Sequence, residues 1–287
     1  MRRFLFAPIL TVMLLFGAMV APVGAITGGQ PDGDGHPQVA LLLAPGLTFC
    51  SGALIAPSTI LTAGHCTSFW TELAADPDVE LENIQVSFDS QASVDADWMP
   101  DGGNWYTASS WVTHPGYVDA DWPFTYDYGL LYLDAPVSIA PATLADVGTL
   151  DPIIDSRGQT DARFEDVGYG VQGAIVGGGG PPRRAITWER KVSLQRYAPG
   201  NGATSGIFHE TWFILNNQPS AQHGGGCGGD SGSPIFAAGT NEIVAVHTGG
   251  YRLGYNGVLC GRMTSLNHRT DINGEYDVYD WILANAR

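Results

Sequence analysis

The stretch GGGCGGDSGSP, from Gly224 to Pro234, decides how the rest of the chain is interpreted. It places Ser231 in a run of glycines, next to an aspartate. A nucleophilic serine must lie on a tight turn whose backbone N–H groups converge on one point. Glycines permit such a turn and let a reacting carbonyl group approach closely. The competing interpretation is a glycine-rich hairpin with an incidental serine, and two other segments bear on that choice.

A histidine and an aspartate in apolar surroundings accompany this serine. LTAGHC, Leu61–Cys66, places His65 at the end of an apolar run, and YDYGLLYL, Tyr126–Leu133, places Asp127 directly before one. Taken alone, such a histidine is usually structural and such an aspartate is usually a turn residue. Together with the Gly-Asp-Ser-Gly motif, and in the chain order His, Asp, Ser, the three resemble the catalytic triad of the chymotrypsin-like serine proteases.

The pattern of apolar residues predicts an all-β fold. The 287 residues include 38 glycines and 18 prolines, with only 15% charged residues, which favours many short strands joined by turns. Apolar, β-branched runs between turn signals indicate strands at Val39–Leu43, Gly52–Thr62, Ile84–Phe88, Trp111–Thr113, Tyr128–Leu133, Phe164–Tyr169, Ile186–Leu194 and Ile243–His247. Only the tail has a helical period, with one face formed by Val278, Trp281, Ile282 and Asn285.

With these motifs, the chain resembles the chymotrypsin-like serine proteases over nearly all of residues 26–287, which would form one domain. ITGG at 26–29 is similar to the start of mature family members, and FCSGALIAPSTILTAGHC at 49–66 to the region before the histidine. THPGY at 113–117 and VGYG at 167–170 also have counterparts. The resemblance implies two packed six-stranded antiparallel β-barrels, with the active site in the cleft between them.

The resemblance also implies a role for each residue of the triad in peptide hydrolysis. Ser231 would attack the peptide carbonyl, His65 would move the proton, and Asp127 would orient the imidazole and stabilise its charged form. The backbone N–H groups of Gly229 and Ser231 would form the oxyanion hole. This chemistry requires no metal and no cofactor.

The chain has four cysteines, Cys50, Cys66, Cys227 and Cys260, which is an even number in a chain with the features of an exported protein. No CxxC motif occurs, and the spacing does not match zinc ligands. Counting alone leaves three disulfide pairings open. The resemblance suggests Cys50–Cys66 and Cys227–Cys260.

The expected specificity pocket departs from that of trypsin. Trypsin-like members carry an aspartate six residues before the catalytic serine, where this chain has Gly225, followed by Gly226. Cleavage after Lys or Arg is therefore not expected. The segment VAVHTGGY at 244–251 should line the pocket with His247, Thr248, Gly249 and Gly250. Thr248 stands where the family usually has a serine that supports the catalytic aspartate.

His247 leaves two specificities open. Glutamate-specific bacterial members carry a histidine at this place, and an imidazole can hydrogen-bond a substrate carboxylate. The alternative is a histidine bonded locally in a pocket that accepts small or apolar residues. The sequence does not decide between acidic and apolar specificity.

The first 25 residues have the features of a secretory signal. Arg2 and Arg3 precede an apolar run, and Val23 and Ala25 provide small residues before a cut. Ile26 would become the new N-terminus and pair with Asp230, as in the family. Export itself would then create the active enzyme. Cleavage after Ala21 would instead leave a four-residue pro-segment.

The signal-like start predicts a secreted, extracellular protein. The net charge of −16, with a single lysine, argues against binding to nucleic acid and, after signal removal, to anionic membranes. The expected partners are protein or peptide substrates and protein inhibitors, and the expected state is a monomer. The alternative function is a catalytically silent binding protein on the same fold. Such relatives usually lose a triad residue, and all three are present here.

Overall fold

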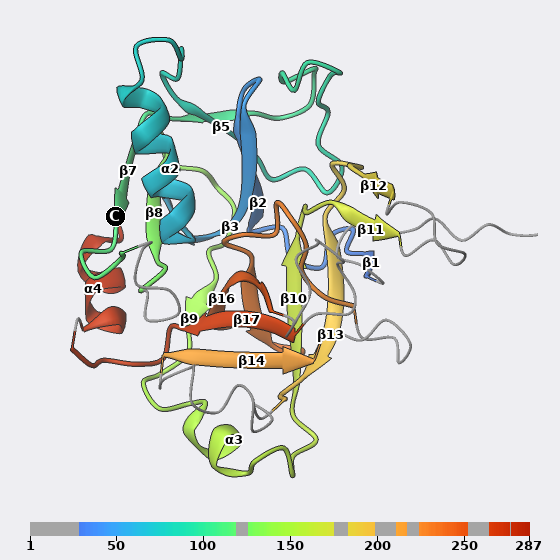
Figure 1. Cartoon of the computed structure of the whole chain (residues 1–287), viewed down its shortest axis with the longest axis vertical. Helices are drawn as coiled ribbons and strands as arrows, with labels where there is room; N and C mark the ends of the chain where they lie inside the picture. Colours follow the sequence, from blue (N-terminus) through green and yellow to red (C-terminus); the bar gives the residue numbers. More distant parts are fainter. Residues whose placement is uncertain are drawn as a thin grey trace, which may run out of the picture.

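The computed structural model describes residues 29–118, 126–174, 183–198, 211–216, 224–251, 264–275 and 277–287. Two curled sheets with few helices form this part of the chain, one a half-barrel and the other nearly closed (Figure 1). The prediction of an all-β fold with two packed antiparallel barrels and a short C-terminal helix is confirmed. The hydrogen-bonded sheets contain seven and eight strands, because short edge strands join each of them.

The first sheet is built from the N-terminal half of the chain. Its spatial order is β6 (Tyr106–Ala108), β5 (Ile84–Ser87), β2 (Val39–Ala44), β3 (Thr48–Ala56), β4 (Thr59–Thr62), β8 (Gly129–Tyr132) and β7 (Ser110–Thr113). β2 and β4 are buried along their whole length. The single strand predicted at Gly52–Thr62 is two strands, because Pro57 lies in the turn between them and cannot donate to a sheet.

The second sheet begins with the N-terminal strand. Its order is β1 (Gln30–Pro31), β13 (Lys191–Arg196), β10 (Arg163–Gly168), β15 (Pro234–Ala237), β16 (Glu242–Tyr251), β17 (Thr264–Arg269) and β14 (Trp212–Asn216). A short strand, β9 (Thr143–Leu144), pairs with β16 in parallel, and β11 (Gln172–Ala174) and β12 (Arg183–Ala185) form a separate pair. The strand predicted at Ile186–Leu194 starts only at Lys191, and the sequence pattern did not reveal β14 and β17.

The structure describes three helices: α2 (Gly64–Ala75), α3 (Asp151–Asp155) and the predicted tail helix α4 (Val278–Asn285). α2 lies against β7 and β8 (Figure 1). It was not expected from the sequence, because its N-cap Ala63 supplies no capping side chain. None of the helices in the described ranges is long and apolar enough to cross a bilayer.

One hydrophobic core continues across both sheets. It joins first-sheet residues such as Leu42 and Leu130 to Phe236 and Val246 of the second sheet. The chain end returns to the first sheet, where the carbonyl of Arg287 accepts hydrogen bonds from two hydroxyl groups at the start of β4. Among the described residues of the predicted site, Ser231 lies where the two sheets meet, because its carbonyl bonds to β3 and the next residue, Gly232, bonds to β16.

Candidate active site

The pairing of β4 with β8 brings His65 and Asp127 together. The register aligns Thr62 with Gly129, so the residues just beyond each strand become neighbours. The backbone N–H of His65 donates to Asp127 Oδ1 at 2.6 Å, and His65 Nδ1 lies 2.8 Å from Oδ2. Both oxygens of the Asp127 carboxylate therefore bind the histidine, one through its backbone N–H and the other through Nδ1.

Asp127 is ionised despite its burial. Its side chain is only 1% exposed, and burial alone raises the pKa of a carboxyl group. The nearby histidines His65 and His268, together with the hydrogen bonds from His65, outweigh burial and lower the pKa of Asp127 to about 2. A fixed negative charge behind the imidazole is what stabilisation of an imidazolium requires.

Ser231 lies on a turn that is tied to both sheets. Its carbonyl accepts the N–H of Ser51 on β3, and the N–H of Gly232 donates to the carbonyl of His247 on β16. Gly229 and Gly232 have φ angles of +93° and +84°. A Cβ on Gly232 would lie 2.1 Å from Thr62 Oγ1. Only glycine fits this turn, as the sequence pattern predicted.

The two amides predicted to form the oxyanion hole are not used in the fold. Within the described ranges, the N–H groups of Gly229 and Ser231 donate to no backbone or side-chain acceptor. The carbonyl of Gly229 points the other way and accepts the hydroxyl of Ser51 at 2.9 Å. Backbone donors left open in this way can bind an oxyanion.

Asp230 is a fully buried carboxylate held by backbone amides. Oδ1 accepts the N–H of Gly170 at 2.7 Å, and Oδ2 accepts the N–H of Cys227 at 2.8 Å. Burial and the neighbouring Asp166 raise the pKa of Asp230 to about 7, against the lowering effect of His247. A cationic partner would stabilise the ionised form of such a buried carboxyl group. Its predicted partner, Ile26, lies outside the described residues.

His247 is buried behind the predicted pocket wall. Its side chain is 1% exposed, and a Cβ on Gly226 would lie 2.3 Å from its ring, so Gly226 packs directly against the imidazole. His247 Nδ1 is 3.1 Å from Asn267 Oδ1 and 3.2 Å from Ser265 Oγ. Burial lowers the pKa of His247.

Asp166 completes this buried polar cluster and was not expected from the sequence. Asp166 Oδ2 is 3.8 Å from His247 Nδ1 and accepts a hydrogen bond from Gln195 at 3.1 Å. Burial raises the pKa of Asp166 to about 7, although bonds from Gln195 and the Gly226 backbone oppose this. Within the described ranges, Asp166 Oδ1, Gln195 Oε1 and Ser233 Oγ have no hydrogen-bond partner.

The remaining pocket residues continue along β16. Thr248 Oγ1 lies 2.7 Å from Nδ1 of the buried His268, on the neighbouring strand β17. The His268 ring packs against Tyr128, the residue after Asp127, with ring centroids 5.5 Å apart. The structure places His268 close enough to lower the pKa of Asp127. Gly249 and Gly250 follow, partly or fully exposed.

The predicted disulfide Cys50–Cys66 is present and links β3 to α2 beside His65. Cys227 is also disulfide-bonded, and its predicted partner Cys260 lies outside the described residues. Ligand atoms of Cys50, His65 and Cys66 lie within 4.8 Å of one another. Both sulfurs belong to the disulfide, so they are not thiolate ligands for a metal.

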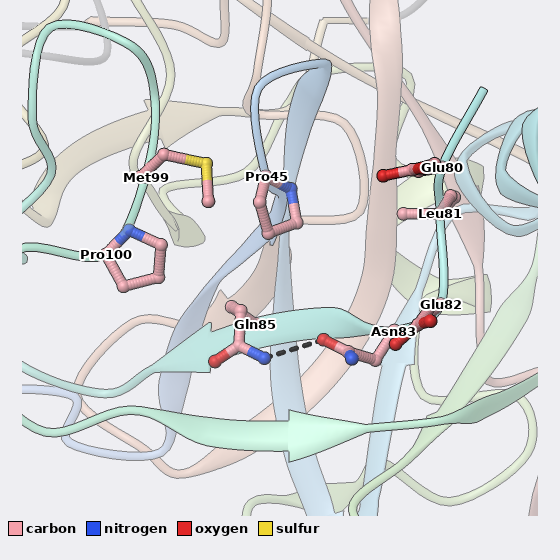
Figure 2. Close-up of a pocket in the computed structure, with 8 residues that line it drawn as sticks. All are labelled: Pro45, Glu80, Leu81, Glu82, Asn83, Gln85, Met99 and Pro100. Atoms are coloured by element: carbon pink, nitrogen blue, oxygen red, sulfur yellow. Dashed lines mark hydrogen bonds between the residues drawn. The ribbon is translucent and has the colours of Figure 1, made fainter. Parts of the chain in front are cut away.

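The hollows on the described surface include the following two. One, of about 260 Å³, adjoins His65 and is lined by His65, Ser68, Phe69, Glu72 and Tyr117. The other, of about 490 Å³, contains no predicted site residue (Figure 2). It is lined by Pro45, Glu80, Leu81, Glu82, Asn83, Gln85, Met99 and Pro100.

The Trypsin family model matches residues 26–261. A trypsin from Saccharopolyspora erythraea is 33% identical over 123 residues, which are 42% of this chain and 47% of that protein, so the match spans about half the length of that relative. Serine protease 1 of Drosophila melanogaster is 23% identical over 80% of this chain and 77% of its own length. A structure titled HL collagenase has a TM-score of 0.59 at 17% identity, over 90% of this chain and 96% of that one, which shows the fold. The chain therefore belongs to the trypsin family of chymotrypsin-like serine proteases.

Proposed function

We propose that the chain is a secreted serine endopeptidase that works through Ser231, His65 and Asp127. The observation that carries this proposal is that Asp127 binds His65 through two contacts, one to the backbone N–H and one to Nδ1. It fixes the imidazole with Nδ1 towards the carboxylate, so that Nε2 is the ring nitrogen that would take the proton of the serine. Family membership and the glycine-dependent turn around Ser231 support the same conclusion.

The proposed mechanism assigns one role to each of these groups. Ser231 Oγ attacks the peptide carbonyl while His65 Nε2 takes its proton, and Asp127 stabilises the imidazolium that forms. The Gly229 and Ser231 amides bind the oxygen that becomes negative. The C–N bond breaks when His65 returns the proton to the leaving amine. Water then attacks the acyl-enzyme, again with His65 as base, and releases the acid and free serine.

For specificity, we propose cleavage after uncharged small or apolar residues in preference to Glu, and not after Lys or Arg. Gly225 and Gly226 offer no carboxylate to a basic side chain. The His247 ring is 1% exposed and bonded internally, and burial lowers its pKa, so it offers little positive charge to Glu. Peptides that differ only in the residue before the scissile bond decide the order, and a clear preference for Glu would reverse this proposal.

For activation, we propose that the amine of Ile26 pairs with Asp230 after signal removal. The sheet register supports this: Pro31 is aligned with Lys191, which is aligned with Gly168, two residues before the Gly170 amide that binds Asp230. Two strand spacings are about 10 Å, and the five residue-to-residue steps from position 26 to position 31 can span about 17 Å. Secretion fits the Cys50–Cys66 disulfide, which persists in oxidising compartments.

A serine-directed fluorophosphonate probe tests the proposed function. We expect the protein starting at Ile26 to be labelled and to cleave peptides, and the Ser231→Ala variant to do neither. A catalytically silent binding protein would show neither labelling nor cleavage in its native form. That result would refute the proposed activity.

A further inference from the structure

The smaller hollow, beside His65, is formed by one face of a helix and a facing aromatic residue. His65, Ser68, Phe69 and Glu72 lie on α2 at spacings of three, four and seven residues, which places them on the same side of the helix. Tyr117 closes the hollow from the segment after β7. A substrate held at His65 therefore has this hollow directly beside its scissile bond.

The walls of the hollow are aromatic and its far end is acidic. Phe69 is 46% exposed, so its ring offers apolar surface to a side chain that enters the hollow. Glu72 is exposed, about 10 Å along the helix from His65. Within the described ranges no ion pair involves Glu72, and α2 contains no Lys or Arg.

We propose that this hollow is a subsite for a Lys or Arg side chain of the substrate, next to the residue that enters the specificity pocket. The aliphatic stem would pack on Phe69 and Tyr117, as long cationic side chains do on aromatic surfaces. The charged end would meet the carboxylate of Glu72. This inference rests on the proposed function, because the hollow adjoins a scissile bond only if His65 is the catalytic base.

The test uses peptides with one fixed cleavable residue and Lys, Leu or Glu at each flanking position in turn. Pairs of exposed charges contribute up to about 1 kcal/mol, so we expect kcat/KM for Lys to exceed that for Leu about three- to fivefold at one position. Glu at that position should be disfavoured. The preference should weaken as added salt screens the charges. In Glu72→Gln the ratio of Lys to Leu should fall to about 1.

The second hollow supplies the matched control, because the whole protein is acidic and attracts cations from a distance. Glu80→Gln removes one carboxylate from the hollow shown in Figure 2, which contains no triad residue. The ratio of Lys to Leu should survive in this variant. An equal loss in both variants, or an unchanged ratio in Glu72→Gln, would overturn the inference.

The outcomes also separate this inference from the proposed function. If the wild-type protein cleaves peptides but shows a ratio of about 1 at every position, only the subsite is refuted. If it cleaves none of the peptides and does not react with the fluorophosphonate probe, the proposed function and the subsite are both refuted.

Discussion

In the two halves of the candidate site, the pKa values of buried carboxyl groups shift in opposite directions. On the side of the first sheet, Asp127 is buried against a close histidine that donates to both its oxygens, and its pKa falls to about 2. On the side of the second sheet, Asp166 and Asp230 are buried beside each other, and their pKa rises to about 7. Burial is complete in all three cases, so the partners decide the charge.

This contrast fits a division of labour. A carboxylate that must stay charged beside the proposed catalytic histidine needs a dedicated partner with good geometry. The carboxyl groups near the predicted specificity pocket instead bind backbone amides, that of Gly226 for Asp166 and those of Gly170 and Cys227 for Asp230. The first arrangement suits the proposed chemistry, whereas the second holds the backbone near Ser231.

The largest effect should come from removing a reacting group. Ser231→Ala and His65→Ala should each lower kcat by about 10⁴-fold or more, because triad residues act as a unit. Steady-state kinetics on a peptide substrate measure this, and circular dichroism checks that the fold is intact. Near-normal activity in pure Ser231→Ala would exclude the proposed mechanism. The low pKa of Asp127 would then have no role in catalysis.

The next effect concerns the missing partner of Asp230. A form that starts with an extra Met before Ile26 should lose about 100-fold or more in kcat/KM, because leaving a buried charge without its partner costs about 3–5 kcal/mol. N-terminal sequencing of the secreted protein and kinetics of the two forms measure this. Full activity of the Met-extended form would show that the Ile26–Asp230 pairing does not operate.

The same pairing has a defined pH dependence. A free N-terminal amine has a pKa of about 7.7–8.0, and a buried carboxylate partner should raise it. Its contribution is then fully present below the free-amine pKa and is lost as pH rises through the raised value. Activity of the Ile26 form should therefore decline reversibly at alkaline pH. If the amine kept its charge throughout this range, or if the pairing with Asp230 did not form, activity would show no such decline.

The contrast also explains how much could be predicted from the sequence. His65, Asp127 and Ser231 stand in short motifs whose local chemistry is distinctive, and the Cys50–Cys66 disulfide follows from the family resemblance that those motifs carry. The tail helix was predictable because its apolar face repeats at the helical period. These features depend on residues that are close in sequence or recognisable by type.

The buried cluster could not be predicted, because its contacts depend on strand register. Asp166 meets Gln195 because β10 pairs with β13, and His247 meets Asn267 because β16 pairs with β17. One residue of slip would send each side chain to the other face. α2 was missed for a related reason: the burial of Trp70 against the first sheet and the Cys50–Cys66 disulfide stabilise it, whereas no capping side chain marks its start.

A smaller effect should follow from removing the disulfide that links β3 to α2 in the first-sheet half of the site. Replacing both Cys50 and Cys66 by Ala should lower the free energy of unfolding by about 3 kcal/mol, because the disulfide closes a short loop. Urea unfolding under non-reducing conditions measures this loss. Unchanged stability in the double variant would show that packing alone holds His65 in place on this side.

The smallest effect tests the other side, where burial rather than pairing controls charge. Asp166→Asn removes a carboxyl group whose pKa burial raises from 3.8 to about 7. Below pH 3.8 the group is protonated in both the folded and the unfolded chain and makes no difference. As pH rises towards 7, the unfolded chain ionises first, so the wild type loses stability, and above 7 the loss is complete. The substitution should therefore stabilise the protein above pH 7 and have little effect at pH 4. The new amide can also donate to Gln195 Oε1, which has no partner within the described ranges.

Thermal unfolding across this pH range measures the difference, with Asp78→Asn, at an exposed position, as the control for lost surface charge. A destabilisation by Asp166→Asn at pH 8 would mean that Asp166 is ionised and paired. Asp166 would then resemble Asp127, and the contrast between the two halves of the site would not exist.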